Sequence, residues 1–382
     1  MLIVVITLLL IGQKSSGKAM VVSVSTDGHY AISSNEDKTI ILWNLNNHSY
    51  RVVGTNANIY SAYFIPHSHK FIWQDLNDIV HVQNVKGKQL KHFPNFPTYV
   101  EVMTSDLKHY FASDVDWNLY SGIGDQQHRI MHDKDGFYGF GKLLNLSLSN
   151  NEQYLLSSGA GGNWYDNTPL DKPHGHDNLE ATVLWQVKTG QPIRKFPGLQ
   201  VKSFATVAPN NQTIIGVDES ENILLWPNKN KSQHRQLANY DGYLYNEKTK
   251  SGHKYTDKIP SIPSDFHGFF VKQPSVGVIS TRFITKNVFF TIHFGVPYLI
   301  LYKGQKVFPF KFLSLGRKPY PSVADYERNS SIDTSWRAHI LVTGQQKQGG
   351  IIVYKYNPNK QTLKKVWAPQ PKKWQVWLRG WV

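Results

Sequence analysis

A short two-strand pattern recurs along this chain and constrains its fold more than any other feature. The clearest copy runs from Asp27 to Asn44, DGHYAISSNEDKTIILWN: a turn, a short strand, a second polar turn, and an apolar strand ending in Trp43. Buried strands favour β-branched and aromatic residues, and an Asp in the preceding turn can accept hydrogen bonds from backbone N–H groups. A repeat of this kind predicts an array of similar small β-sheets.

Six further copies can be aligned with the first. In all but the fourth copy, the residue that opens the first strand lies 10 to 14 residues before the position that ends the second. The fourth fits if a loop separates its two strands, because Ala181 to Val187 repeats Thr39 to Leu45 almost position by position. Turn-forming residues precede several copies. The marker pairs are Tyr30 with Trp43, Phe71 with Gln83, Tyr110 with Tyr120, Tyr154 with Trp185, Ile214 with Trp226, Phe289 with Tyr302, and Ile340 with Tyr354.

The first copy resembles a blade of the WD-repeat family, with its pattern D-x-T-I-x-L-W-[DN]. The resemblance covers roughly residues 18 to 367, is strong only in the first copy, and implies a β-propeller. The family's Gly-His pair ahead of each blade is absent, and copies two, three, six and seven lack the strand-end Trp, so we expect most blades to lack the family's internal His-to-Asp hydrogen bond. The residues on family positions are Asp37, Thr39, Ile40, Leu42, Trp43 and Asn44, with Trp185 and Trp226 at the strand ends of copies four and five.

The predicted fold is therefore all-β: a single seven-bladed β-propeller of four-stranded blades. Six or eight blades are the main alternatives, and a sandwich or barrel also contains short strands at such intervals. The predicted organisation is a signal-like or anchoring segment at residues 1–17, the propeller at 18–367, and a basic, Trp-rich tail at 368–382.

Four segments exceed the regular repeat, and we expect all of them on one face. They run from about Gly159 to Glu180, Asp133 to Lys142, Asn239 to Ser275, and Ser314 to Ser330. The first separates the second and third strands of a blade and the others follow outermost strands, so strand alternation sends all four to the same side. Loops on a rigid scaffold often carry function.

Aromatic residues in these insertions are the predicted partner-binding anchors, since such residues are enriched at interfaces. The alternative is that the same rings pack the loops against the rim of the propeller and do not bind a partner. The predicted anchors are Trp164, Tyr165, Phe137, Tyr138, Tyr243 and Tyr245.

Motifs for catalysis or metal binding are few. His174, His176 and Asp166 have ligand chemistry, but two histidines in one loop are expected by chance among 16, so we predict no metal or other cofactor. Asp133 to Gly136 resembles the start of a calcium loop, yet Phe137 takes the next ligand position, which favours a turn. No G-x-S-x-G, Walker, dinucleotide or H-E-x-x-H motif is present.

Charge and termini bear on partners and location. The net charge of +15 attracts acidic partners, but with no long basic run or recognition motif we do not expect nucleic-acid binding. The apolar run Leu2 to Ile11 has the length of a secretory signal and is too short for a membrane helix. It also resembles a bacterial lipoprotein lipobox with Gln13 in place of the lipidated Cys. The alternative is a folded first strand, which would make the protein cytoplasmic.

The C-terminal segment from Lys364 to Val382 combines cations with four tryptophans and contains no acidic residue. Such a segment suits an anionic membrane surface, or it can fold back over a blade edge. Together these features predict a non-enzymatic protein-interaction scaffold, exported, periplasmic or membrane-associated in a bacterial cell envelope. The alternative is a propeller enzyme, a hydrolase or lyase with its site at the channel mouth. The tail residues concerned are Lys364, Lys365, Trp367, Lys372, Lys373, Trp374, Trp377, Arg379 and Trp381.

Overall fold

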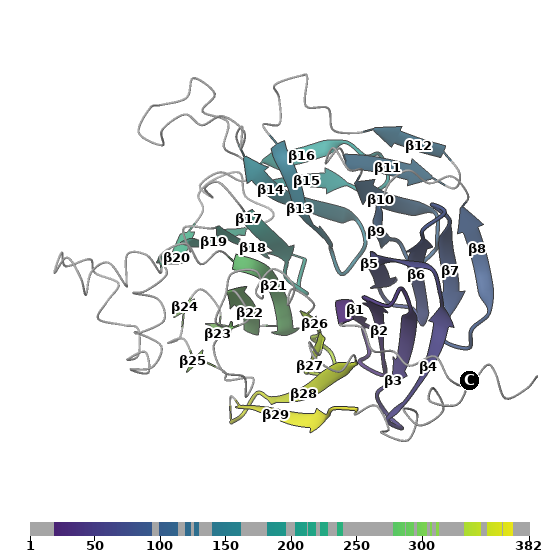
Figure 1. Ribbon diagram of the computed structural model, residues 1–382. Helices are drawn as coiled ribbons and strands as arrows, with labels where there is room; N and C mark the ends of the chain where they lie inside the picture. The colour runs from purple at the N-terminus through teal and green to yellow at the C-terminus, as the bar shows by residue number, and fades with distance from the viewer. Residues whose placement is uncertain are drawn as a thin grey trace, which may run out of the picture.

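The structure is a computed structural model of the 382-residue chain. Its described part is built from β-strands joined by turns and short connections (Figure 1). The described residues are 19–93, 99–113, 119–123, 126–129, 140–161, 182–195, 203–211, 213–218, 222–227, 235–239, 278–286, 288–293, 296–303, 306–307, 311–312, 332–344, 350–360 and 362–369.

Hydrogen bonding groups the described strands into seven sheets, numbered here in chain order, each made of antiparallel strands consecutive in the sequence. The first sheet contains β1 (Ala19–Val24), β2 (Tyr30–Asn35), β3 (Ile40–Asn44) and β4 (Ser49–Gly54). The second contains β5 (Ala57–Phe64), β6 (Lys70–Asp75), β7 (Val80–Asn84) and β8 (Gln89–Phe93). The third contains β9 (Tyr99–Met103), β10 (His109–Ser113), β11 (Leu119–Ile123) and β12 (Gln126–Arg129).

The remaining sheets continue this order. The fourth contains β13 (Phe140–Leu148), β14 (Tyr154–Gly161), β15 (Thr182–Gln186) and β16 (Pro192–Lys195). The fifth contains β17 (Ser203–Val207), β18 (Thr213–Asp218), β19 (Asn222–Pro227) and β20 (Arg235–Asn239). The sixth contains β21 (Val278–Thr285), β22 (Val288–His293), β23 (Val296–Lys303), β24 (Lys306–Val307) and β25 (Lys311–Phe312). The seventh contains β26 (Ile332–Ser335), β27 (Ile340–Gly344), β28 (Ile351–Asn357) and β29 (Thr362–Trp367).

The sheets are arranged around a common centre, as in a β-propeller, with β1, β5 and β13 among the strands nearest that centre (Figure 1). The first strand of each sheet contacts the first strand of the next, and β1 also contacts β26 of the seventh sheet. The predicted all-β propeller architecture is therefore confirmed. In the sixth sheet, β24 and β25 both pair with β23, so its outer edge departs from the predicted four-strand pattern.

The repeat found in the sequence corresponds to the second and third strands of each sheet. Phe71 pairs directly with Gln83, and Ile214 pairs directly with Trp226. The other marker pairs lie on the same two adjacent strands of their sheets. The spacing therefore reports one hairpin per sheet, and the loop allowed in the fourth copy lies between β14 and β15.

The hydrophobic core lies between neighbouring sheets. Trp43 of the first sheet packs in one cluster with Val342 and Ile351 of the seventh. Further clusters join the first sheet to the second, the second to the third, the third to the fourth, the fourth to the fifth, and the sixth to the seventh. Full burial of a large apolar side chain is worth about 1.5–3 kcal/mol, so these sheets stabilise one another.

Polar side chains on the inner strands tie the first sheet to both of its neighbours. The Ser23 hydroxyl donates to Asp333 Oδ2 (3.2 Å) and accepts the Phe64 N–H (3.1 Å). The Val24 N–H donates to the same Asp333 oxygen (2.8 Å), and Arg282 Nε lies 3.6 Å from Asp333 Oδ1. Burial raises the pKa of Asp333, against the opposing effects of Arg282 and these hydrogen bonds.

Candidate functional site

The strand order defines two faces. Because consecutive strands are antiparallel, connections between first and second strands open on one side, named here the turn face. Connections between second and third strands, and from the outer strand to the next sheet, open on the other, the insertion face. All four predicted insertions connect at the insertion face: β14 to β15, β12 to β13, β20 to β21, and β25 to β26.

The insertions themselves fall almost wholly outside the described residues. The six predicted anchors Trp164, Tyr165, Phe137, Tyr138, Tyr243 and Tyr245 lie there, as do the metal candidates His174, His176 and Asp166. Trp226 lies on β19, opposite Ile214.

The insertion face is described over the first two sheets, where tight turns join the second and third strands. Asp37 Oδ1 accepts hydrogen bonds from the Thr39 N–H (3.2 Å) and hydroxyl (2.6 Å), as its sequence position predicts. In the second sheet, Asp75 Oδ1 accepts from backbone N–H groups of the following turn, and its Oδ2 lies 3.1 Å from His81 Nε2. Although burial raises the pKa of Asp75, these bonds outweigh it and lower the pKa below its usual value.

Two of the predicted repeat-structural tryptophans are fixed by the same contact. Trp43 donates its indole N–H to the Ser33 hydroxyl (3.0 Å), and Trp185 donates to the Ser157 hydroxyl (2.7 Å). Both rings are buried. The serine on the neighbouring strand therefore accepts the hydrogen bond of the buried indole N–H. This stabilises the fold, since a buried N–H without an acceptor is destabilising.

The turn face repeats a [Ser/Thr]-x-[Asp/Asn] turn in the first, third and fourth sheets. The Ser25 hydroxyl donates to Asp27 (2.7 Å), that of Thr104 donates to Asp106 (2.7 Å), and that of Ser149 donates to the side chain of Asn151 (2.8 Å). The same hydroxyl accepts the N–H that begins the second strand, as in Ser25 with Tyr30 (3.0 Å).

Neighbouring turns of this face are also bonded to one another. The His67 N–H donates to the Thr26 hydroxyl (3.0 Å), Lys70 Nζ donates to the Ser105 carbonyl (3.0 Å), and the Ser105 N–H donates to Glu152 (3.0 Å). Hydrogen bonds across four successive sheets restrict movement of one sheet against the next, so the described turn face is a rigid surface.

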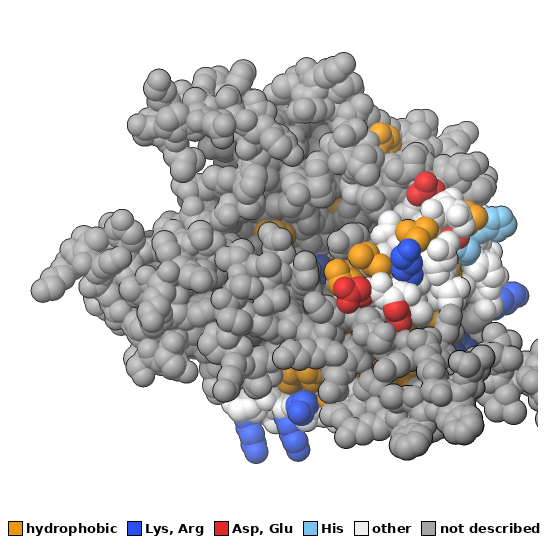
Figure 2. Space-filling view, in the orientation of Figure 1, with side chains coloured by type: hydrophobic (Ala, Val, Ile, Leu, Met, Phe, Trp, Pro, Cys, Tyr) orange, Lys and Arg blue, Asp and Glu red, His pale blue; other side chains and the backbone are white. Residues whose placement is uncertain are grey.

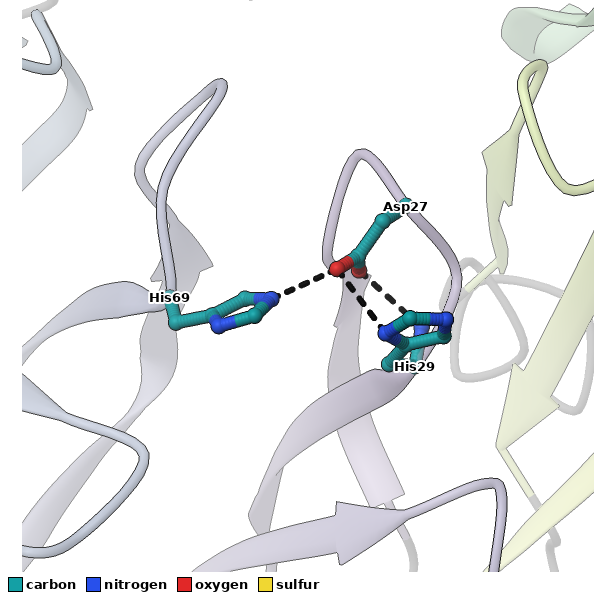
Figure 3. A group of neighbouring side chains, drawn as sticks. All are labelled: Asp27, His29 and His69. Carbon is teal, nitrogen blue, oxygen red and sulfur yellow. Dashed lines mark hydrogen bonds and ion pairs between the residues drawn. The ribbon is translucent and has the colours of Figure 1, made fainter.

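Three potential metal ligands meet on this face, where the first and second sheets adjoin. Asp27 Oδ2 lies 2.5 Å from His69 Nε2 and 3.1 Å from His29 Nδ1, and Figure 3 shows the carboxylate between the two imidazoles. Although burial raises the pKa of Asp27, the hydrogen bonds from His69, Ser25 and the His29 backbone lower it to about 2. Sequence reasoning missed this cluster; the available signal was a histidine immediately before the second strand in both of the first two copies.

A basic groove of about 530 Å³ lies on the same face between the sixth and seventh sheets. Arg337 lies 5.1 Å from the centre of the Trp336 ring, a cation–π distance. Burial and the charge of Lys355 lower the pKa of His339. The positive charge here suits an acidic group. The groove is lined by Thr285, Lys286, Trp336, Arg337 and His339.

Trp367, the last residue of β29, is packed against the first sheet. The Trp367 ring lies 6.0 Å from that of Trp43, edge to face, and stacks on His48 at 5.0 Å. Lys364 and Lys365 on the same strand are exposed, and basic side chains project beside β28 and β29 in Figure 2. The other tail tryptophans lie outside the described residues, as do residues 1–18. The described part of the chain contains no helix with the length and hydropathy of a membrane span.

Comparison with known proteins supports the fold alone. No family model and no curated protein match the sequence. Among solved structures, the chain is similar to one described as "Crystal Structure of Mitotic Checkpoint Complex": the two are 9% identical, with 92% of this chain and 90% of that chain covered and a TM-score of 0.56. At this identity the similarity shows a β-propeller fold and leaves the function open.

Proposed function

We propose that this chain is a non-enzymatic scaffold in which seven blades form one closed ring and the insertion face binds protein partners. One observation carries the proposal: the described strands that flank the four long insertions have their connecting ends on the same face. On the opposite face, the described short turns of the first four sheets are hydrogen-bonded to one another. These bonds fix the positions of the strands in those sheets. The similar solved structure comes from a protein complex, which is compatible with a role in assembly.

Contacts between the first and seventh sheets support closure of the ring. Asp333 on β26 accepts hydrogen bonds from Ser23 and Val24 on β1, and the Ser335 hydroxyl donates to the Thr26 carbonyl (2.6 Å). Trp43 and Ile351 extend this junction into the hydrophobic core. Closure thus joins the first and last described sheets by side-chain packing and hydrogen bonds.

A propeller enzyme is the second candidate, and Asp333 is the observation that favours it. A carboxyl group with a raised pKa is common at catalytic sites. Here, however, both carboxylate oxygens face partners within the fold, namely Ser23, Val24 and Arg282. We therefore assign Asp333 to ring closure.

Export to, or attachment at, the cell envelope is part of the proposal. It rests on the apolar run Leu2 to Ile11 and on the exposed lysines of β29, which suit an anionic membrane surface. Fractionation of cells that express the chain from its own Met1 tests this location. Recovery of all the protein in the cytosol with Met1 retained would contradict it.

The binding face can be tested by pull-down from the native host with matched variants. Replacing both Trp164 and Tyr165 with Ala should remove most partner binding, because interface aromatics often contribute 2 kcal/mol or more. Charge reversal of Lys108 or Arg337, both exposed on the turn face, should leave partners bound. Loss of partners only in the charge-reversal variants would assign binding to the turn face instead.

A further inference from the structure

We propose that Asp27, His29 and His69 form a divalent transition-metal site that clamps the first sheet to the second. The residues are one carboxylate and two imidazoles, a ligand set suited to Zn²⁺, Cu²⁺, Ni²⁺ or Co²⁺. Their ligand atoms all lie within 4.8 Å of one another, on two separate turns (Figure 3). Atoms bound to one such ion are roughly 3–3.5 Å apart at the usual bond lengths, so small side-chain rotations suffice.

The blade repeat explains why the two histidines meet. Each occupies the residue before the second strand of its sheet, and in each the backbone carbonyl accepts a hydrogen bond from the loop after the third strand. Leu45 N–H donates to the His29 carbonyl (2.8 Å), and Val85 N–H donates to that of His69 (2.9 Å). Gln153 takes the equivalent place in the fourth sheet, where Val187 N–H makes the same bond (3.0 Å). The pair is therefore held by two copies of one rigid turn.

The two oxygens of the Asp27 carboxylate have separate roles. Oδ1 accepts hydrogen bonds from the Ser25 hydroxyl (2.7 Å) and the His29 N–H (3.1 Å), which fix the carboxylate in its own turn. Oδ2 faces both imidazoles. Hydrogen bonds that hold a ligating side chain in place orient it toward a metal, and their loss commonly lowers metal affinity 10- to 100-fold.

The position of His69 relative to Asp27 is also fixed. The His67 N–H bond to Thr26 joins the two turns, and the Tyr30 ring lies edge-on to the His69 imidazole at 5.3 Å. Lys70, the next residue along, directs its ammonium group to the Ser105 carbonyl and away from the cluster. Binding requires His69 to carry its proton on Nδ1, leaving Nε2 as the ligand. Half of each imidazole surface is exposed, so the ion can enter from solvent.

Titration of the full chain, purified without a histidine tag, with Zn²⁺ and Co²⁺ tests the site. Calorimetry should give one saturable site per chain, and Co²⁺ should give a visible absorption band. His69→Ala and His29→Ala should each weaken binding at least about tenfold. Asp27→Asn keeps a side-chain oxygen for the turn and should weaken binding similarly, which separates ligand loss from misfolding.

His92→Ala is the matched control, because His92 is exposed on β8 and lies outside the cluster. It should bind Zn²⁺ like the wild type. Zn²⁺ should also raise the thermal unfolding midpoint of the wild type and His92→Ala, and raise that of His69→Ala less. Absence of saturable binding, or equal binding by the wild type, Asp27→Asn and His69→Ala, would overturn the proposal.

Discussion

The first and second sheets share strand order and the register of their central hairpin but fill their cores in opposite ways. In the first, Trp43 on β3 donates its indole N–H to Ser33 on β2. In the second, Gln83 takes the register position of Trp43, and Trp73 on β6 takes that of Ser33. The large ring has moved to the neighbouring strand. In these two sheets the buried tryptophan therefore comes from either of the two central strands.

The exchange changes the polar contacts around the ring. Trp73 stacks on His81 with ring centroids 4.1 Å apart, and His81 bonds to Asp75. This histidine lies on the third strand of its sheet and not ahead of the blade, so the contact differs from the internal His-to-Asp bond of the WD-repeat family. The Trp73 indole N–H is buried without a hydrogen-bond acceptor, whereas that of Trp43 has one. The indole N–H of the buried tryptophan is thus hydrogen-bonded in the first sheet and not in the second.

The largest expected effect separates the two sheets at one register position. Trp43→Ala should lower the free energy of unfolding by about 3–5 kcal/mol, because the buried ring packs against both the first and the seventh sheets. Gln83→Ala, at the equivalent position of the second sheet, should cost less than about 1 kcal/mol. Urea unfolding followed by circular dichroism measures both values. Equal losses would show that the two sheets do not differ as described.

The contrast between these sheets also explains how much the sequence could predict. The strand spacing located the central hairpin of every sheet, because turn chemistry and alternating burial are local properties. The strand-end tryptophan identified the first sheet, but in the second the ring is Trp73, one strand earlier, and no strand-end pattern could detect it. The Asp27, His29 and His69 cluster was missed because it combines turns of two sheets, and only the ring geometry brings those turns together.

Gly54 of the first sheet leaves space for the Trp73 ring of the second. A Cβ added at Gly54 would lie 2.7 Å from Trp73 Cζ2, closer than van der Waals contact allows. Gly54→Ala should therefore cost about 1–3 kcal/mol of unfolding free energy through overpacking. Combining it with Trp73→Phe should cost less than the sum of the two single changes. Strict additivity in a double-mutant cycle would mean that the two residues do not interact.

A smaller effect is expected from the Trp43–Ser33 hydrogen bond, which the first sheet has and the second lacks. Ser33→Ala removes the acceptor for the buried Trp43 N–H and should cost about 1–2 kcal/mol. Trp43→Phe removes the donor, so adding Ser33→Ala to that variant should cost less than it does in the wild type. The same unfolding assay measures the coupling. An unchanged cost in the Phe background would indicate that Ser33 acts through packing alone.

The smallest expected effect is on stability at low pH. It distinguishes the two sheets because the first has Asn35 at the position where the second has Asp75. The pKa of Asp75 is lower in the folded chain, since hydrogen bonds from His81 and the turn outweigh burial. A lowered carboxyl pKa contributes stability above the unfolded value of about 3.9, and that stability is lost as the pH falls through the folded value. Asp75→Asn should therefore lower the free energy of unfolding by about 1 kcal/mol at pH 7, and the difference from the wild type should shrink as the pH falls from 5 to 2.

Asp78→Asn changes an exposed carboxylate in the same turn and is the matched control. It should follow the wild type across this range. A constant difference between Asp75→Asn and the wild type would show that the Asp75 charge does not stabilise the second sheet.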